Sequence, residues 1–138
     1  MSVLDASVVL KWLVDEADSE RALRLREEYS YGKEEIVVPD LVLYEIANSL
    51  RYHPGFSTDE IKTAVGSLFD MGIEIVAPTY GLLSKAIDIA RNDNVTCYDA
   101  VYLALAEDIG ETFITADEKF VGNLSKVRRK SVRLLREF

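Results

Sequence analysis

The sequence predicts an α/β protein in which a central parallel sheet is covered by helices on both faces. Short runs of β-branched and aliphatic residues recur along the chain, and longer segments with helical apolar spacing separate them. Hairpin turn signals are almost absent. Strands that alternate with helices pair in parallel, and ligands of such sheets bind beyond the carboxyl ends of the strands. The residues that follow each predicted strand are therefore the first candidates for a functional site.

The expected strands and helices alternate along the whole chain. Strands are expected at 2–6, 35–39, 72–77 and 112–116, with a further candidate at 131–135. Helices are expected at 7–31, 40–53, 57–71, 80–93, 97–109 and 117–124. Gly72 and Gly110 stand where helices should end, because glycine adopts the left-handed conformation of a helix C-terminus without strain.

Capping signals mark several of the helix starts. Pro39-Asp40 precedes one helix, and capping-box spacing occurs in the pairs Ser57 with Glu60, Thr96 with Asp99, and Thr115 with Glu118. The Thr96 pair leaves open whether Asp99 holds a helix end or takes part in chemistry.

Length and composition fit one globular domain, residues 1–138. The chain has 49% hydrophobic and 29% charged residues, with no low-complexity tract, repeat or linker. A chain of this length buries roughly two-thirds of the surface that its unfolded form exposes. We therefore expect it to fold without a disulfide or a structural metal.

Cysteine usage and charge limit the compartment and the partners. Cys97 is the single cysteine, and the N-terminal stretch has neither a basic start nor an uninterrupted apolar core, so we expect a cytoplasmic protein without a membrane span. The net charge of −8 argues against sequence-independent binding of nucleic acid over a broad basic surface. A basic run occurs at 126–136. Such runs form a solvated or partner-binding face more often than a phosphate site.

Asp5 and Asp117 follow two of the predicted strands. Asp5 comes directly after an apolar pair and before a helical segment, so helix capping and ligand binding are both open for its carboxylate. Beyond the strand at 112–116, Thr115 and Glu118 already have the spacing of a capping box. Asp117 is therefore predicted to be left over and to point into the cleft.

Glu45 and Asp99 lie on predicted helices that carry little other polarity. An unpaired buried carboxylate is costly, so Glu45 needs water or a partner such as a cation. Asn48 lies one turn further on the same side of that helix. No charge occurs between Asp99 and Glu107, which predicts a buried helix whose first acid projects toward the same cleft as Asp5.

These acids together predict a metal site. Asp5, Glu45, Asp99 and Asp117 come from four separate segments, and without a cation they would repel one another and raise one another's pKa values. Mg²⁺ or Mn²⁺ resolves that repulsion, because both ions prefer oxygen ligands. Such a site suits phosphodiester hydrolysis, for which no nucleophile from the protein is required.

Four motifs occur in a specific order: VLDASVVLKWL at 3–13, VPDLVLYEIANSL at 38–50, NVTCYDAVYLALAEDIG at 94–110 and FITADEKF at 113–120. In this set and order the chain resembles the PIN-domain ribonucleases, and among them the VapC-type toxins of toxin–antitoxin pairs. The resemblance implies a three-layer α/β/α fold, Mg²⁺ or Mn²⁺ in an acidic pocket, and endoribonuclease activity on single-stranded RNA.

The resemblance also assigns residues and partners. The acidic positions of the family fall on Asp5, Glu45, Asp99 and Asp117, with Ser7 and Thr115 as supporting polar residues and Asn48 as a further partner. Asp99 is accordingly interpreted as a ligand first. A VapB-type antitoxin that inserts a basic residue among the acids is implied, as is a homodimer.

The same acidic residues have two rival interpretations. A non-catalytic PIN-like module would use the acidic pocket only to receive a basic partner segment. A phosphatase that begins at Asp5 is disfavoured, because Ser7 stands where that class places a second Asp. No glycine-rich phosphate loop occurs, so no nucleotide cofactor is expected.

Several chemically capable side chains are set aside. His53 is expected in a surface turn, and Cys97 is expected at a helix start. The aromatic residues expected to pack are Trp12, Tyr44, Tyr98 and Tyr102, with Tyr98 also a candidate for the edge of the pocket.

Overall fold

A five-stranded parallel sheet forms the centre of the computed structural model, which describes residues 1–138. The strands are β1 (Ser2–Leu4), β2 (Ile36–Pro39), β3 (Glu74–Val76), β4 (Thr112–Thr115) and β5 (Val132–Leu134). Their order is β3-β2-β1-β4-β5, and every neighbouring pair is parallel. The predicted sheet is confirmed, including the candidate strand near the C-terminus.

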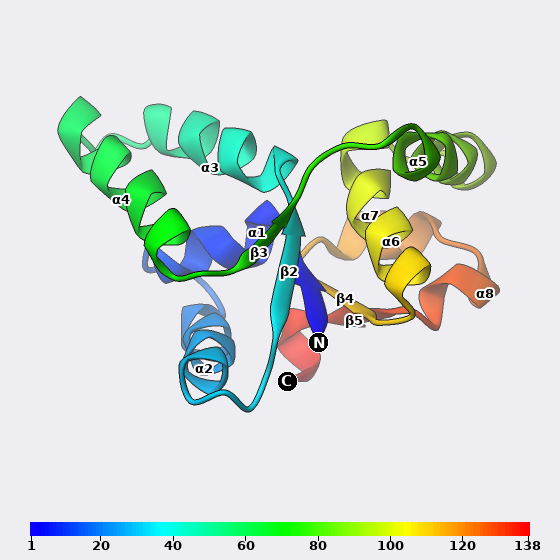
Figure 1. The fold of residues 1–138 in the computed structure, drawn as a ribbon, viewed down its shortest axis with the longest axis horizontal. Coiled ribbons are helices and arrows are strands. Elements are labelled where there is room, and N and C mark those ends of the chain that lie inside the picture. Colours follow the sequence, from blue (N-terminus) through cyan, green and yellow to red (C-terminus); the bar gives the residue numbers. More distant parts are fainter.

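Helices cover both faces of this sheet. They are α1 (Ala6–Val9), α2 (Ser19–Ser30), α3 (Leu41–Arg51), α4 (Thr58–Asp70), α5 (Tyr80–Asp93), α6 (Cys97–Ile109), α7 (Glu118–Asn123) and α8 (Lys126–Arg129), with short 3₁₀ turns η1 (Leu10–Trp12) and η2 (Leu135–Glu137). Figure 1 shows α3 and α4 on one side of the central strands and α5 and α6 on the other. The arrangement is the expected three-layer α/β/α fold.

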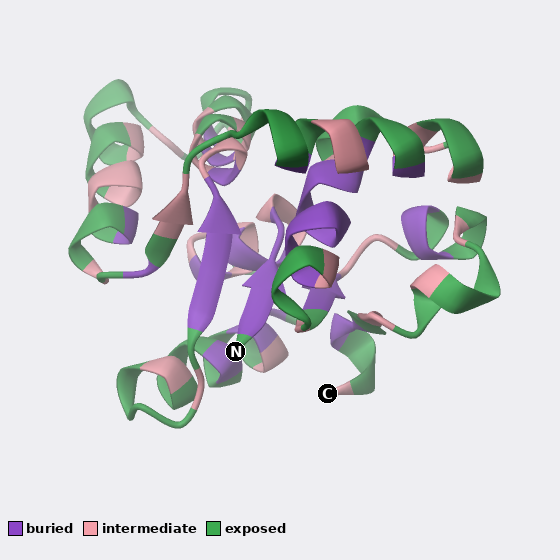
Figure 2. Cartoon of the chain, turned by 45° about the vertical axis from the view of Figure 1, so that its right-hand side comes forward, coloured by how far each residue is buried: buried purple, intermediate pink, exposed green.

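One hydrophobic core of 31 buried residues joins the three layers. Strands β1, β2 and β4 are almost entirely buried, as Figure 2 shows in purple, whereas the outer helices expose one side. Helix α6 is buried from Ala100 to Ala106, as its lack of charge predicted. The ring of Tyr102 on α6 stacks on Phe113 of β4, with 5.8 Å between the centroids. This contact packs α6 against β4.

The single helix predicted for 7–31 is wrong. The chain instead forms α1, η1, an irregular segment at 13–18, and then α2. The break has a local cause, because Asp18 adopts a left-handed conformation with φ 64°. The Ser19 hydroxyl also accepts a hydrogen bond from the Glu16 backbone N–H at 2.9 Å and donates one to the Val14 carbonyl at 3.1 Å. These bonds replace the helical ones.

Other helix ends follow the sequence closely. Gly72, which follows α4, and Gly110, which caps α6, both have positive φ, 72° and 70°. Ser57 and Glu60 form a complete capping box at the start of α4. Helix α8 was not expected, and Ser125 caps it. None of the helices combines the length and the apolar character needed to cross a membrane.

Candidate active site

Asp5 is held at the carboxyl end of β1 by hydrogen bonds to both of its carboxylate oxygens. The parallel register pairs Leu4 with Ile114, which brings Asp5 next to Thr115 at the end of β4. The hydroxyls of Ser7 and Thr115 donate to the two oxygens of the Asp5 carboxylate. The Val8 backbone N–H also donates to it at 3.2 Å, so Asp5 caps α1. Asp5 therefore fills the capping role that the sequence left open, and it also lines a cavity.

The capping prediction for α7 is wrong. Asp117, not Thr115, is the N-cap of α7, and its carboxylate accepts a hydrogen bond from the Phe120 backbone N–H at 3.0 Å. The Thr115 hydroxyl instead donates to Asp5 and accepts from the Asp117 backbone N–H at 3.1 Å. Thr115 is fully buried, and its hydroxyl orients the Asp5 carboxylate while it holds the backbone of Asp117.

At the start of α6, the capping duty falls on Thr96. Its hydroxyl accepts a hydrogen bond from the Asp99 backbone N–H at 3.1 Å, which satisfies one of the unpaired donors at this helix end. The Asp99 carboxylate does not complete a reciprocal capping box. It faces the cavity instead and is available to a ligand.

Glu45 has a partner that the sequence did not predict. The Tyr102 hydroxyl on α6 donates a hydrogen bond to the Glu45 carboxylate on α3. The sequence predicts only packing for Tyr102, and its ring does pack in the core. The sequence does contain a signal for this site role. Tyr102 lies three residues after Asp99, and therefore on the side of α6 that faces the acids.

All four predicted acids line one cavity of about 240 Å³. Its walls are formed by Asp5, Ala6, Ser7, Leu10, Glu45, Ser49, Asp99, Tyr102 and Asp117. Asn48, predicted as a supporting residue, is exposed and does not line this cavity. Ser49 lines the cavity instead. It lies four residues after Glu45 on α3, so both side chains are on one side of this helix.

The acids of the cavity influence one another electrostatically. Burial raises the pKa of Asp5 to about 6, although the hydrogen bonds from Ser7, Thr115 and Val8 oppose this shift. Burial also raises the pKa of Glu45, and the charge of Asp99 adds to the effect. The pKa of Asp99 is raised by burial and by Asp117. The negative charge in this cavity is therefore unfavourable without a cation or a basic partner.

The donor set fits a hard divalent cation. Every candidate ligand is a carboxylate, and each oxygen that already accepts one hydrogen bond can accept a second interaction. As the side chains stand, no group of three or more His, Cys, Asp or Glu residues is arranged to hold a metal ion. The fit to a metal thus rests on ligand chemistry and mutual repulsion, not on a preformed coordination shell.

The residues for which the sequence predicts no catalytic role differ in their burial and contacts. Trp12 is buried and its indole N–H donates to the Ala22 carbonyl at 2.8 Å, as expected for a core residue. His53 lies in a turn after α3 and accepts from the Gly55 backbone N–H at 3.1 Å. Tyr44 and Tyr98 are 71% and 67% exposed, so the packing predicted for them is wrong. They line a separate, mainly apolar groove formed by residues of α3, α5 and α6, and none of the four acids lines it.

Comparison with known proteins agrees with this architecture. The family model for the PIN domain matches residues 2–123. Ribonuclease VapC3 of Pyrobaculum aerophilum is 33% identical over 121 residues, which cover 85% of this chain and 89% of the relative.

Solved structures share the fold at low sequence identity. VapC20 of Mycobacterium tuberculosis, described as a sarcin-ricin loop cleaving toxin, has a TM-score of 0.69 and 18% identity, over 88% of this chain and 94% of that one. A toxin–antitoxin complex from Klebsiella pneumoniae has a TM-score of 0.71 and 10% identity, over 98% of each chain. With the family match over most of its length, this chain belongs to the PIN-domain family, and within it resembles the VapC-type ribonucleases.

Proposed function

We propose that this protein is a Mg²⁺- or Mn²⁺-dependent endoribonuclease that hydrolyses single-stranded RNA in the cytoplasm, as the toxin of a VapBC-type pair. The observation that carries the proposal is the convergence of Asp5, Glu45, Asp99 and Asp117 on one cavity from four separate segments. The 33% identity to a VapC ribonuclease supports the reaction class.

The side chains of the cavity would act by holding charge in fixed positions. Ser7 and Thr115 orient the Asp5 carboxylate, and Tyr102 orients that of Glu45. The Phe120 backbone N–H fixes one oxygen of Asp117. A bound Mg²⁺ or Mn²⁺ would lower the pKa of water and offset the charge that develops at phosphorus.

The reaction then requires no covalent enzyme intermediate. The oxygen of a water molecule attacks phosphorus, the bond from phosphorus to the leaving oxygen breaks, and that oxygen takes up a proton. Acids in this position also exclude RNA that arrives without a cation, since phosphates and carboxylates repel. We therefore expect cleavage to depend strictly on divalent metal.

Cleavage of a panel of labelled single-stranded RNAs by the purified protein tests the function. We expect cutting in Mg²⁺ or Mn²⁺ that is lost in EDTA, restored by added metal, and lost in Asp5→Asn. Cutting that persists in EDTA or in Asp5→Asn would assign the activity to a contaminant or another site. Metal binding without cutting of any RNA would favour the rival function, a module that binds a basic partner segment.

The acidic cavity also suits a protein partner. We propose that a VapB-type antitoxin places a basic side chain among the acids, because their shared charge favours a cation of either kind. The solved structures with this fold include a toxin–antitoxin complex, which supports the partner class. Inhibition of cleavage by the purified antitoxin, relieved when its basic residue is replaced, would test this assignment.

A homodimer is proposed on a different surface. Apolar side chains are exposed along α5 and next to it on α3 and α6, namely Tyr44, Tyr80, Leu83, Ile87 and Tyr98. Exposed apolar patches of this kind are typical of protein interfaces. Analytical ultracentrifugation should find a dimer that Ile87→Glu dissociates, whereas a wild-type monomer would contradict the proposal.

A further inference from the structure

A second cavity adjoins the acidic cavity. It has a volume of about 380 Å³, and its lining includes Asn94, Asp99, Asp117, Lys119 and Asn123. Asp99 and Asp117 line the acidic cavity as well, so the two volumes meet at these carboxylates. A nucleotide bound in the second cavity would therefore lie next to a phosphodiester held among the acids.

Lys119 is the only cationic side chain that lines either cavity. It is exposed and forms no ion pair. Its neighbour Glu118 is already engaged, because Arg136 contacts the Glu118 carboxylate at 2.8 Å. The ammonium group of Lys119 is therefore available to an anionic ligand in the second cavity, next to the acids.

The backbone that carries Lys119 is firmly anchored, although α7 is short. Phe120 and Val121 are buried in the core, and the Phe120 ring packs edge-on against Phe113 with 5.9 Å between the centroids. Asp117, two residues before Lys119, caps the N-terminus of this helix. Lys119 thus stands at a defined position beside the acids, and only its flexible side chain has to be ordered by a ligand.

Two amide side chains face the same cavity. Asn94 ends α5 with φ 55°, and Asn123 is the last residue of α7. Both are exposed, and neither side chain makes a hydrogen bond within the protein. An amide offers donors and acceptors at once, which suits the edge of an unpaired base or a ribose 2′-hydroxyl.

We propose that the second cavity binds the nucleotide next to the scissile phosphodiester, with Lys119 on its phosphate and Asn94 and Asn123 on its sugar or base. This inference rests on the ribonuclease function proposed above. Its physical basis is charge, because the acidic reaction site repels RNA phosphates and Lys119 is the one cationic side chain that lines either cavity. A cation at the rim holds the strand in register without neutralising the acids themselves.

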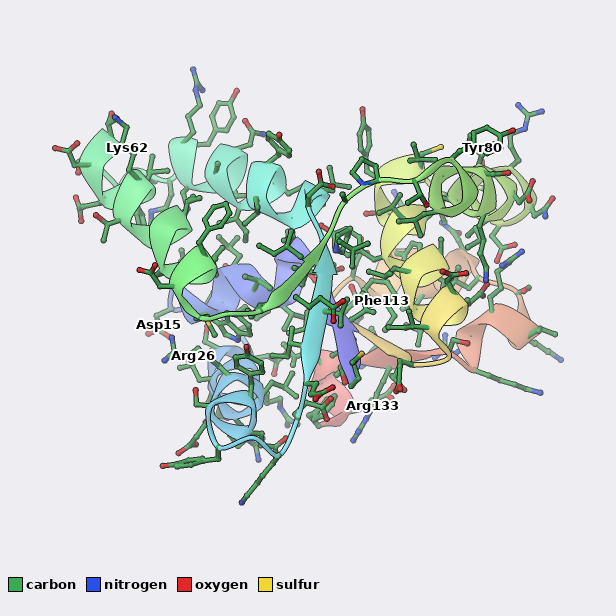
Figure 3. All side chains as sticks on the ribbon, in the orientation of Figure 1. Asp15, Arg26, Lys62, Tyr80, Phe113 and Arg133 are labelled. Carbon is green, nitrogen blue, oxygen red and sulfur yellow. The ribbon has the colours of Figure 1, made fainter.

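Binding of labelled single-stranded RNA to Asp5→Asn protein in Mg²⁺, measured by fluorescence anisotropy over a range of KCl concentrations, tests the subsite. In this background Lys119→Met should raise Kd about three- to tenfold and reduce the slope of log K against log salt by about 0.7, the value for one single-strand phosphate contact. Lys119→Arg should restore both. Lys62→Met is the matched control, since Lys62 is an exposed lysine on α4 at the opposite end of the molecule (Figure 3).

Steady-state cleavage by otherwise wild-type protein provides the second readout. Asn94→Gly, which keeps the left-handed backbone, and Asn123→Ala should raise KM more than they lower kcat. The subsite is overturned by an unchanged Kd and salt slope in Lys119→Met, by an equal effect of Lys62→Met, or by a slope that depends instead on Lys126 and Lys130. Wild-type cleavage with an unchanged Lys119→Met slope refutes only the subsite, whereas Lys119-dependent binding without cleavage by the wild type refutes the ribonuclease function.

Discussion

The Tyr102 hydroxyl on α6 donates a hydrogen bond to the Glu45 carboxylate on α3, across 57 positions of sequence. The bond joins two helices at the edge of the acidic cavity. It also keeps Tyr102 protonated, because burial and the adjacent carboxylate raise the pKa of its phenol well above the ordinary value. Tyr102 therefore acts as a fixed donor, and it is a positioning residue for Glu45.

Tyr102→Phe should separate this positioning role from packing. The ring stacked on Phe113 is retained, but the Glu45 carboxylate loses its only side-chain donor. We expect the free energy of unfolding to fall by about 1–3 kcal/mol and kcat to fall more than KM rises. Urea denaturation and steady-state RNA cleavage would measure the two effects. Tyr44→Phe, at an exposed tyrosine in the apolar groove, is the control, and equal kcat values in the two variants would contradict the assignment.

Asp99→Asn should abolish cleavage while leaving α6 intact. Its backbone N–H, which receives the Thr96 cap, is unchanged, and only the charge facing the cavity is removed. We expect kcat to fall at least about a hundredfold, by analogy with loss of a preorganised electrostatic group. Asp108→Asn, at an exposed position of the same helix, should keep the wild-type rate.

Thr96→Ala, unlike Asp99→Asn, should lower the stability of the protein. Removal of an N-cap hydroxyl costs about 1 kcal/mol of stability. Circular dichroism during thermal unfolding should show a clear loss of stability for Thr96→Ala and none for Asp99→Asn, because burial raises the pKa of the Asp99 carboxyl and a neutral amide avoids that cost. A reversed order would mean that the Asp99 carboxylate, not the Thr96 hydroxyl, holds the helix end.

The stability of the metal-free protein should depend on pH through Asp5. Burial raises the pKa of Asp5 from 3.8 to about 6, so the folded protein binds this proton more tightly than the unfolded chain does. The resulting stabilisation is complete below about pH 4 and is lost as the pH rises through about 6. Asp5→Asn remains neutral, so above about pH 6 it should be more stable than the wild type by up to about 3 kcal/mol. Urea denaturation of both proteins in EDTA from about pH 4 to about pH 7 checks this, and a constant difference between them would contradict it.

Arg128 should matter for stability more than its basic neighbours. Its guanidinium contacts Asp93 at 3.6 Å and Glu107 at 3.2 Å, and the Asp93 side chain is only 5% exposed. Arg128→Ala leaves these two acids without their shared cation, which should lower the free energy of unfolding by about 1–3 kcal/mol. Arg129→Ala, at an exposed position without an ion pair, should change it little. Denaturation midpoints that are equal for the two variants would show that this part of the basic run is a solvated face.

Local patterns in the sequence determined the layered fold and the positions of the four acids. Apolar spacing distinguishes strands from helices, and a parallel sheet brings the carboxyl ends of its strands to one edge. For this reason Asp5 and Asp117, each just beyond a strand, lie at the same cavity as predicted. The near absence of charge in α6 likewise predicted its burial.

The tertiary structure decided which of several locally acceptable contacts each side chain makes. Thr115 and Asp117 are both good caps, and their local preferences differ by too little to choose between them. The choice follows from the register of β1 with β4, which brings the Thr115 hydroxyl to Asp5 and leaves Asp117 to cap α7. The bond from Tyr102 to Glu45 has the same origin, because spacing along one segment carries no information about which residue of another segment lies opposite. Sequence periodicity thus determined where the acids stand, and packing between segments determined what orients them.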